Sequence, residues 1–341
     1  MKTINNLLSS PVTLDYLRER QPRNFLGRVL FPAKPIDSLS FKYVKGSNNL
    51  PVMTKVTPFG SLAPIVDRKG IEMVQGKIPA IKAKINLDEE EYLQLIKFTN
   101  RGYDIPESVI RELYDDIGYT YDAVVNKIEY LRWQALTNGE LDFVEDGYNY
   151  KVDYGMPNAN KPTVSEDWGT ENADILGDLT AWINTIVNNG GSRPTRAVTS
   201  NKVMEHMLAD EKIRKAIHGV NSDKLLTINE LNSFFTQRSL PAVTTYDLQV
   251  KLYNGTTTRF LNENKFILLP GDGIVGETLQ APTAEELLSA ETARIVKSED
   301  KVTVIQWEEK EPIALWTKAA AAQIPSMPFI DNVISATVIT S

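Results

Sequence analysis

A long amphipathic helix is the feature that most restricts how this chain can fold. Between Tyr119 and Asn138, apolar residues recur at spacings of three and four, which places them on one face of an α-helix. Gly139 follows, and glycine can adopt the left-handed conformation that ends a helix without steric cost. Upstream, Asp104-Ile105-Pro106-Glu107 contains the residues of a helix start. If the helix continues through Gly118, it is about 50 Å long at ~1.5 Å per residue, which is long for a globular domain.

Size and composition exclude several classes of protein. With 341 residues, 42% of them hydrophobic, the chain can form about two or three domains with substantial cores. The absence of cysteine excludes a disulfide scaffold and thiolate chemistry. The N-terminal residues lack the apolar core of a secretion signal, and no apolar run approaches the length of a membrane span. The net charge of −7 argues against nucleic-acid binding by the whole surface.

The charges are distributed unevenly along the chain. From Lys42 to Lys84 there are eight basic and two acidic residues, whereas from Asp88 to Asp146 there are fifteen acidic and five basic residues. Such runs are consistent with two solvated faces of one molecule. They are also consistent with a basic segment of one subunit that lies across the acidic surface of the next.

The first 40 residues have few periodic signals beyond a possible short helix after Thr13. A segment this short cannot form a core of its own, yet it contains Leu26, Val29, Leu30 and Phe31. We expect these side chains to be buried against this domain or against a neighbouring subunit.

Residues 41–87 have the pattern of a long, exposed β-hairpin. Ile81, Ala83 and Ile85 alternate with lysines, a period of two that separates an apolar from a charged face, and Phe41 and Tyr43 are candidates for the partner strand. Repeated glycine and proline between these strands predict an extended arm rather than a compact sheet. Long insertions of this kind are usually functional or disordered, and binding to a neighbour is the natural use.

The remaining chain alternates between hairpin, helix and strand signals. From about Ala173, a helix, a strand and a helix with a break near Asp210 predict a second, α/β-like domain, and the last strand is expected to return to the first domain. The expected elements are a helix that starts with Asp88-Glu89-Glu90-Glu91, a hairpin over 141–154, a helix over 175–189, a strand over 195–199, helical residues 202–217, a hairpin turn at 253–256, and strands at 266–269, 302–307, 313–316 and 333–339.

No pattern of catalytic or metal-binding residues is found. Gly271-Asp272-Gly273-Ile274-Val275-Gly276 fits a dinucleotide-binding pattern and follows a predicted strand, but the helix that must come next is interrupted by Pro282. His206 and His218 are too far apart in sequence to be two ligands on one helical face. Adjacent carboxylates such as Asp115 and Asp116 diverge in direction, so solvation is their default role. The sequence therefore predicts no enzyme, no cofactor and no metal site.

The order of these elements has a counterpart among viral shell proteins. The chain resembles the tailed-phage major capsid proteins of the lambda-type capsid protein E family, over essentially its whole length. The residues that carry the resemblance are Asn24-Phe25-Leu26 with Phe31-Pro32, Pro58-Phe59-Gly60 followed by Ala63-Pro64, Asn138-Gly139, Val152-Asp153-Tyr154-Gly155, and the closing Pro312, Pro325, Met327, Pro328 and Phe329.

This resemblance implies an α+β chain with the Hong Kong 97 phage-type capsid fold. That fold has an N-terminal arm, an extended β-loop (E-loop), a peripheral (P) domain with a long spine helix, and an axial (A) domain. The implied ranges are 1–40 for the arm, 41–87 for the E-loop, 88–172 and 290–341 for the P domain, and 173–289 for the A domain.

The resemblance also implies a function and partners. Hexamers and pentamers of the chain would form an icosahedral shell around double-stranded DNA, without a membrane. The shell would assemble in the bacterial host cytoplasm and become part of the virion. Because the chain begins with the arm, the resemblance suggests a separate scaffolding protein, and portal and decoration proteins are further expected partners.

Charge complementarity gives one specific hypothesis for the contacts between subunits. Basic residues of the E-loop would lie over acidic residues near the long helix of an adjacent subunit. The residues of this hypothesis are Lys45, Lys55, Arg68 and Lys69 on the basic side, and Asp115, Asp116 and Asp122 on the acidic side. Two alternatives remain: an encapsulin-like protein compartment, which would enclose cargo protein, and a nucleotide-binding enzyme that uses Gly271 to Gly276.

Overall fold

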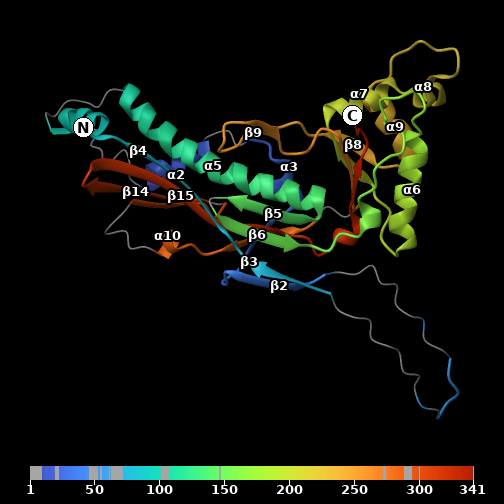
Figure 1. Ribbon diagram of the computed structural model, residues 1–341, viewed down its shortest axis with the longest axis horizontal. Helices are drawn as coiled ribbons and strands as arrows, with labels where there is room; N and C mark the ends of the chain where they lie inside the picture. Colours follow the sequence, from blue (N-terminus) through green and yellow to red (C-terminus); the bar gives the residue numbers. More distant parts are fainter. Residues whose placement is uncertain are drawn as a thin grey trace. The chain divides into compact units, whose positions relative to one another are not determined.

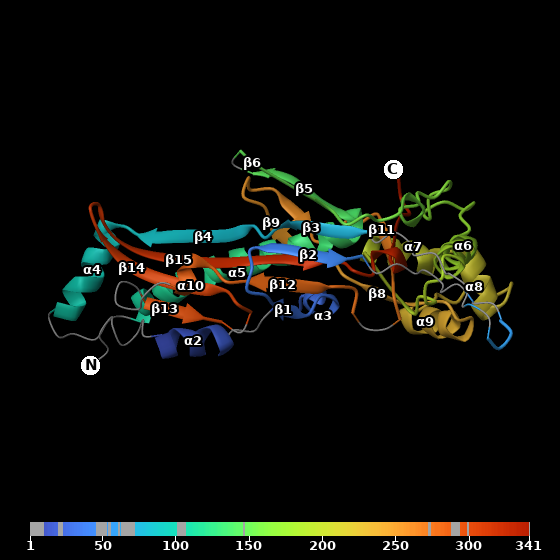
Figure 2. The same cartoon turned by 90° about the horizontal axis from the view of Figure 1, so that it is seen from below.

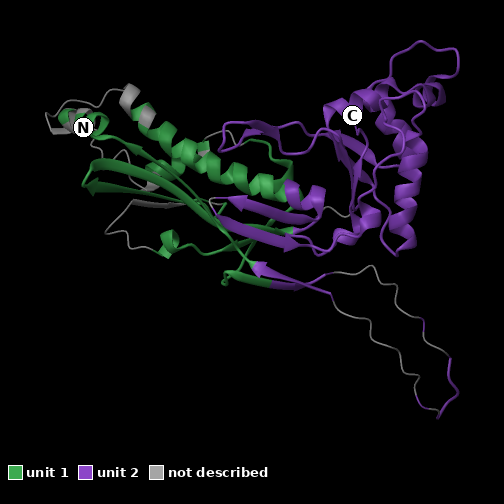
Figure 3. Ribbon diagram, in the orientation of Figure 1, with its two compact units in different colours: residues 1–41, 77–132, 277–325 green, residues 42–76, 133–276, 326–341 purple. Residues whose placement is uncertain are grey.

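The computed structural model divides into two compact units (Figure 3). Unit 1 comprises residues 1–41, 77–132 and 277–325, and unit 2 comprises residues 42–76, 133–276 and 326–341. Both helices and strands are present, so the chain belongs to the α+β class, as predicted. The structure describes residues 10–19, 23–45, 53, 56–60, 62, 72–100, 107–145, 147–271, 274–287, 294–298 and 300–340.

A sheet and a long helix form unit 1 (Figure 1). The sheet has the strand order β1-β12-β15-β14-β13, and β4 also pairs with β15; Figure 2 shows β4, β15 and β14 side by side. The strands are β1 (Ala33–Pro35), β4 (Ala80–Leu87), β12 (Glu277–Ala281), β13 (Arg294–Lys297), β14 (Thr303–Lys310) and β15 (Ile313–Ser326).

The predicted long helix is confirmed. Helix α5 (Glu107–Asn138) runs for 32 residues without interruption at Gly118, and Gly139 ends it with a φ of +71°. Within unit 1, its buried side chains pack against those of β14 and β15. The apolar spacing read from the sequence therefore identified the face that packs on the sheet. The contacting residues include Leu113, Ile117, Val124 and Ile128 of α5, Val304 of β14, and Leu315 and Ala319 of β15.

The strand pairing next to the predicted E-loop differs from our expectation. We expected Phe41 and Tyr43 to pair with the strand that contains Ile81, but β2 (Ser40–Val44) pairs with β3 (Met73–Lys77). Pro79 lies between β3 and β4 and has no N–H for a ladder, so it separates the two strands. Strand β4 then pairs with β15, and its alternation of half-buried apolar residues with exposed lysines is as predicted.

The described part of the N-terminal segment packs against its own chain. It contains helices α2 (Ser10–Glu19) and α3 (Leu26–Leu30), and strand β1 pairs in parallel with β12. Leu30 and Phe31 are buried, whereas Val29 is exposed. Downstream, α4 (Glu89–Asn100) begins as predicted at Asp88, whose carboxylate accepts hydrogen bonds from the amides of Glu90 and Glu91.

Unit 2 is built on a second sheet, with the order β16-β11-β7-β8. Its core combines this sheet with helices α6, α7, α8 and α9. Asp210 ends α7 and caps α8 by accepting a hydrogen bond from the amide of Ile213, which explains the predicted break. The elements are β7 (Arg196–Thr199), β8 (Ala242–Thr245), β11 (Lys265–Leu269), β16 (Ile334–Thr337), α6 (Ile175–Asn188), α7 (Asn201–Ala209), α8 (Glu211–His218) and α9 (Ile228–Gln237).

Two predicted hairpins and several short elements complete the chain. In the hairpins, β5 pairs with β6 and β9 pairs with β10, and their turns contain Gly147 and Gly255 at positive φ. The last strand, β16, pairs with β11, and Thr337 bridges to Thr163. Strand β16 therefore contacts β11, which we assign to the A domain, and Thr163, which we assign to the P domain. The domain limits stay a prediction. The bounds are β5 (Glu140–Glu145), β6 (Tyr148–Asp153), β9 (Gln249–Lys251), β10 (Thr257–Arg259), α10 (Ala284–Leu287), η1 (Asn158–Asn160) and η2 (Ile330–Asn332).

Candidate interaction surfaces

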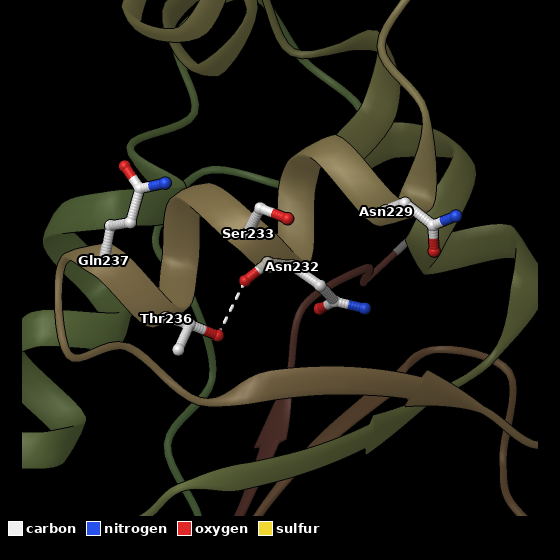
Figure 4. A pocket seen from close by; sticks show the side chains of 5 residues that line it. All are labelled: Asn229, Asn232, Ser233, Thr236 and Gln237. Carbon is white, nitrogen blue, oxygen red and sulfur yellow. Dashed lines mark hydrogen bonds between the residues drawn. The ribbon is translucent and has the colours of Figure 1, made fainter.

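A shallow polar depression lies on α9 (Figure 4). The side chains that line it are uncharged amides and alcohols, so it supplies no general acid or base. The amide of Asn232 is already hydrogen-bonded to the backbone of Val243, at 3.0 and 2.8 Å. Among the described residues, no group of three or more His, Asp or Glu can hold a metal ion. The lining residues are Asn229, Asn232, Ser233, Thr236 and Gln237.

The glycine-rich segment does not have the structure of a nucleotide site. Strand β11 ends at Leu269, and the next element in the chain is strand β12, which begins at Glu277. A dinucleotide site requires a helix at this point, because the amides at the helix N-terminus bind the pyrophosphate. Asp272 and Gly273 lie outside the described residues.

The described part of the E-loop presents apolar side chains to solvent. Met53, Val56, Phe59 and Leu62 are 91%, 101%, 109% and 94% exposed, respectively. Large apolar side chains gathered in one segment at this exposure indicate an interaction surface. Three basic residues of our hypothesis, Lys55, Arg68 and Lys69, lie outside the described residues.

Lys45, the fourth basic residue of the hypothesis, is occupied by its own chain. Its side chain is only 8% exposed, and its Nζ lies 3.0 Å from Oε2 of Glu72 and 2.9 Å from Oδ1 of Asp331. It also donates a hydrogen bond of 2.8 Å to the carbonyl of Gly155. Burial lowers the pKa of Lys45, but the two carboxylates outweigh it and raise the pKa above its ordinary value. Lys45 therefore has no free ammonium to offer a neighbouring subunit.

The acidic side of the hypothesis lies on α5. Asp115 is exposed, and Asp116 and Asp122 are half-buried. Asp115, Tyr119 and Asp122 follow one another at spacings of four and three, so they share one face of the helix. Tyr119 is 70% exposed at the centre of this face. The helical period places Tyr119 opposite the apolar stripe, so this exposed position was predictable from the sequence.

A buried polar cluster joins the N-terminal segment to α5 within unit 1. The Gly27 amide donates to Oε1 of Glu129 at 2.9 Å, and Oε2 of Glu129 lies 3.2 Å from the guanidinium of Arg132. Arg132 donates to the hydroxyl of Thr278 at 3.0 Å, which donates to the carbonyl of Phe31 at 2.8 Å. A Cβ on Gly27 would lie 2.6 Å from Oε2 of Glu129, so any larger residue would displace this carboxylate.

Asp300 adds a second attachment for the N-terminal segment. Its carboxylate lies 2.6 Å from the guanidinium of Arg28 and accepts a hydrogen bond of 2.8 Å from the hydroxyl of Tyr121. Burial and the nearby charge of Asp300 raise the pKa of Tyr121. These contacts hold α3 to the helix α5 of its own chain.

Lys82, a member of the basic run on strand β4 of the E-loop, is also paired within unit 1. Buried Glu285 lies 2.7 Å from Nζ of Lys82 and 2.5 Å from Nζ of Lys318. Burial raises the pKa of Glu285, but the hydrogen bonds from the two lysines outweigh it and lower the pKa to about 2. Part of the basic run therefore stabilises the fold of its own chain.

Comparison with known families identifies the chain. The family of phage major capsid protein E matches residues 14–338. The chain belongs to the phage major capsid protein E family. Comparison with curated protein sequences gives no significant match.

Solved structures confirm the fold of this capsid protein. A candidate capsid protein of a prophage in Escherichia coli CFT073 is 14% identical, with a TM-score of 0.62, and the match covers 97% of this chain and 99% of the other. The capsid of cyanophage A-1(L) gives 12% identity, a TM-score of 0.55, and coverage of 95% and 96%. A phage-related protein from Bordetella bronchiseptica RB50 is 12% identical, with a TM-score of 0.55, and the match covers 97% of each chain. The capsid protein thus has the Hong Kong 97 phage-type fold.

Family membership assigns a structural role. The protein forms the shell of a phage head and is part of the virion. Within the part of the chain that the structure describes, no helix has both the length and the apolar character that a membrane span requires.

Proposed function

We propose that this capsid protein assembles as hexamers and pentamers into an icosahedral shell that encloses double-stranded DNA. Its role is structural, without an enzymatic activity. Assembly takes place in the bacterial host cytoplasm with a separate scaffolding protein, and a portal and a decoration protein bind to the shell. The N-terminal arm spans residues 1–40, the E-loop 41–87, the P domain 88–172 and 290–341, and the A domain 173–289.

The observation that carries this proposal is the exposed apolar set of the E-loop, formed by Met53, Val56, Phe59 and Leu62. Complete burial of one such side chain stabilises a complex by about 1.5–3 kcal/mol. Each subunit of a closed shell makes the same contacts, so moderate contacts add up to a stable assembly. The E-loop is therefore a contact surface for a second copy of the chain.

Charged residues orient the subunits relative to each other and contribute only a small part of the binding free energy. We propose that Lys55, Arg68 and Lys69 lie over Asp115, Asp116 and Asp122 of the adjacent subunit, with Tyr119 between them. Exposed ion pairs contribute only about 0.2–1 kcal/mol each, and salt screens them. Complementary charge instead orients the approaching subunits and disfavours other arrangements.

Electron microscopy and sedimentation test the proposal directly. The protein is produced with and without the products of its neighbouring genes, and particles are examined by negative stain. Large closed shells are the expected result. Small uniform shells filled with protein would instead indicate a compartment of the encapsulin type, and a monomer under both conditions would contradict the proposed use of the E-loop.

A further inference from the structure

Within the E-loop, the two residues that border segment 46–71 meet at a single buried ammonium group. Lys45 follows strand β2, Glu72 precedes strand β3, and the amide of Lys45 donates to the carbonyl of Glu72 at 2.9 Å. The side chain of Lys45 then contacts Glu72 again, at 3.0 Å from Oε2. One residue therefore holds both ends of this segment through its backbone and its side chain.

The same ammonium contacts two further segments of unit 2. One is the carbonyl of Gly155, just after strand β6, at 2.8 Å, and the other is Oδ1 of Asp331 in η2, at 2.9 Å. Strand β2 has another attachment to this region, because the hydroxyl of Tyr43 accepts a hydrogen bond of 3.0 Å from the amide of Met327. The start of the E-loop is thus fixed to the C-terminal segment and to the β5–β6 hairpin.

The groups that contact the ammonium of Lys45 are held in place by other hydrogen bonds. The buried amide of Asn160 donates to the carbonyls of Asp331 and Val333, each at 2.9 Å, and so holds the turn that carries Asp331. The amide of Gly155 donates to the carboxylate of Asp153 at 2.7 Å, and Gly155 has a φ of +71°. Fixed acceptors on two segments define a single place for the ammonium.

We propose that Lys45 is a positioning residue for shell assembly: its buried ammonium fixes both ends of segment 46–71 to the Gly155 and Asp331 segments of unit 2, and thereby sets where the E-loop meets a second copy of the chain. This inference rests on the proposed function, because it assigns the loop to a contact between copies. The energetic reason is that loss of the ammonium leaves Asp331, which is largely buried, without its counter-charge. Lys45 and Glu72, which border segment 46–71, would then separate from Gly155 and Asp331 while the core stays folded.

The contacts of the Lys45 ammonium with Glu72, Gly155 and Asp331 are called the clamp. Lys45→Met tests the clamp in the full-length chain, because methionine fills a similar volume without charge. Lys42→Met is the matched control, since Lys42 is an exposed lysine on the same strand. Hydrogen exchange of the unassembled protein is measured across β2 and β3, with α6 as an internal reference. We expect exchange in β2 and β3 to rise at least about tenfold in Lys45→Met, equivalent to about 1.4 kcal/mol, with α6 and the control unchanged.

Assembly is measured on the same preparations by sedimentation velocity. We expect the yield of closed shells to fall at least about tenfold in Lys45→Met and to be unchanged in Lys42→Met. The double variant Lys45→Met/Asp331→Asn removes the unpaired carboxylate, so it should recover thermal stability and still assemble poorly. A merely structural role for Lys45 predicts instead that this double variant recovers both. If Lys45→Met does not fold, Asp331→Asn and Glu72→Gln probe the same contacts more mildly.

The outcomes separate this inference from the proposed function. Unchanged exchange in β2 and β3 overturns the clamp. Faster exchange with normal shells overturns the positioning role and leaves the proposed function intact. Absence of shells from the wild-type protein and from Lys42→Met overturns the proposed function, while exchange still reports on the clamp.

Discussion

The N-terminal segment and the E-loop look alike in sequence and differ in structure. Both contain large apolar residues in stretches that cannot form a core by themselves. In the N-terminal segment, Leu30 and Phe31 are buried against unit 1 of their own chain. In the E-loop, Phe59 and its apolar neighbours are almost completely exposed.

The difference lies in where the complementary groups are found. The backbone of the N-terminal segment is satisfied by Glu129, by Thr278 and by the ladder between β1 and β12. These partners come from distant parts of the same chain, so folding alone supplies the contacts of Gly27, Phe31 and β1. For the exposed apolar set of the E-loop, Met53, Val56, Phe59 and Leu62, a second copy of the chain supplies the cover in our account. A segment that is rich in apolar residues but cannot form its own core therefore needs a partner. The sequence does not show whether this partner is another part of the same chain or a second copy.

The largest expected effect comes from the attachment of the N-terminal segment. Glu129→Ala leaves the buried guanidinium of Arg132 without its carboxylate and removes the partner of the Gly27 amide. We expect the free energy of unfolding to fall by about 3–5 kcal/mol. Chemical denaturation measures it, with exposed Asp115→Asn on the same helix as control. A loss below about 1 kcal/mol would mean that the cluster does not hold the segment.

The pairing of lysines within the chain predicts a dependence of stability on pH. The pKa of Glu285 is lowered from 4.5 to about 2, so its contribution is present above pH 4.5 and is lost as the pH falls towards 2. At about 1.4 kcal/mol per pKa unit, the loss is roughly 3–3.5 kcal/mol.

Glu285→Gln removes this titration, so its unfolding free energy should be lower at neutral pH and flatter between pH 4.5 and 2. Exposed Glu205→Gln is the control and should follow the wild-type curve. A Glu285→Gln curve parallel to that of the wild type over this range would show that Lys82 and Lys318 do not hold Glu285 in its charged form.

An apolar substitution in the E-loop should separate assembly from folding. Phe59→Ser removes a side chain that makes no core contact, so the melting temperature of the unassembled chain should not change. The contact with a second copy should weaken by about 1.5–3 kcal/mol, which raises the protein concentration needed for assembly more than about tenfold. Light scattering against concentration measures it. The control is Tyr253→Ser, another fully exposed aromatic residue, and equal effects of both variants would refute a specific role of the loop.

The smallest effect is expected from charge reversal in the loop. Arg68→Glu with Lys69→Glu should weaken assembly by about 0.2–1 kcal/mol per lost pair and reduce its dependence on salt. Asp115→Lys in the same chain should partly restore assembly if the two sites meet. Lys42→Glu is the control on strand β2. Assembly that keeps the wild-type salt dependence after the reversal would exclude these ion pairs.

The sequence predicted the elements that depend on local signals. Helix α5 follows from its apolar period and from Gly139, and the break between α7 and α8 follows from the capping residue Asp210. The hairpin β5–β6 follows from alternation around a turn with Gly147. These signals act over a few residues, so they can be read without knowledge of the tertiary structure.

The sequence did not predict contacts between distant residues. The pairing of β4 with β15, instead of with β2, depends on a strand more than two hundred residues away. We expected Lys45 to contact an adjacent subunit, because its partner Asp331 is remote in sequence. The hydrogen bond between Gly27 and Glu129 likewise joins residues 102 positions apart. Charge and hydropathy show that a group needs a partner, and only the fold shows which one.

The most direct test of the account compares hydrogen exchange in the unassembled protein and in closed shells. We predict that peptides containing Met53, Phe59 and Leu62 gain strong protection on assembly, because a second copy covers them. Peptides containing Gly27 and Phe31 should be equally protected in both states, because their partners lie in the same chain. E-loop peptides that exchange equally fast before and after assembly, or an N-terminal segment protected only in shells, would contradict the central claim.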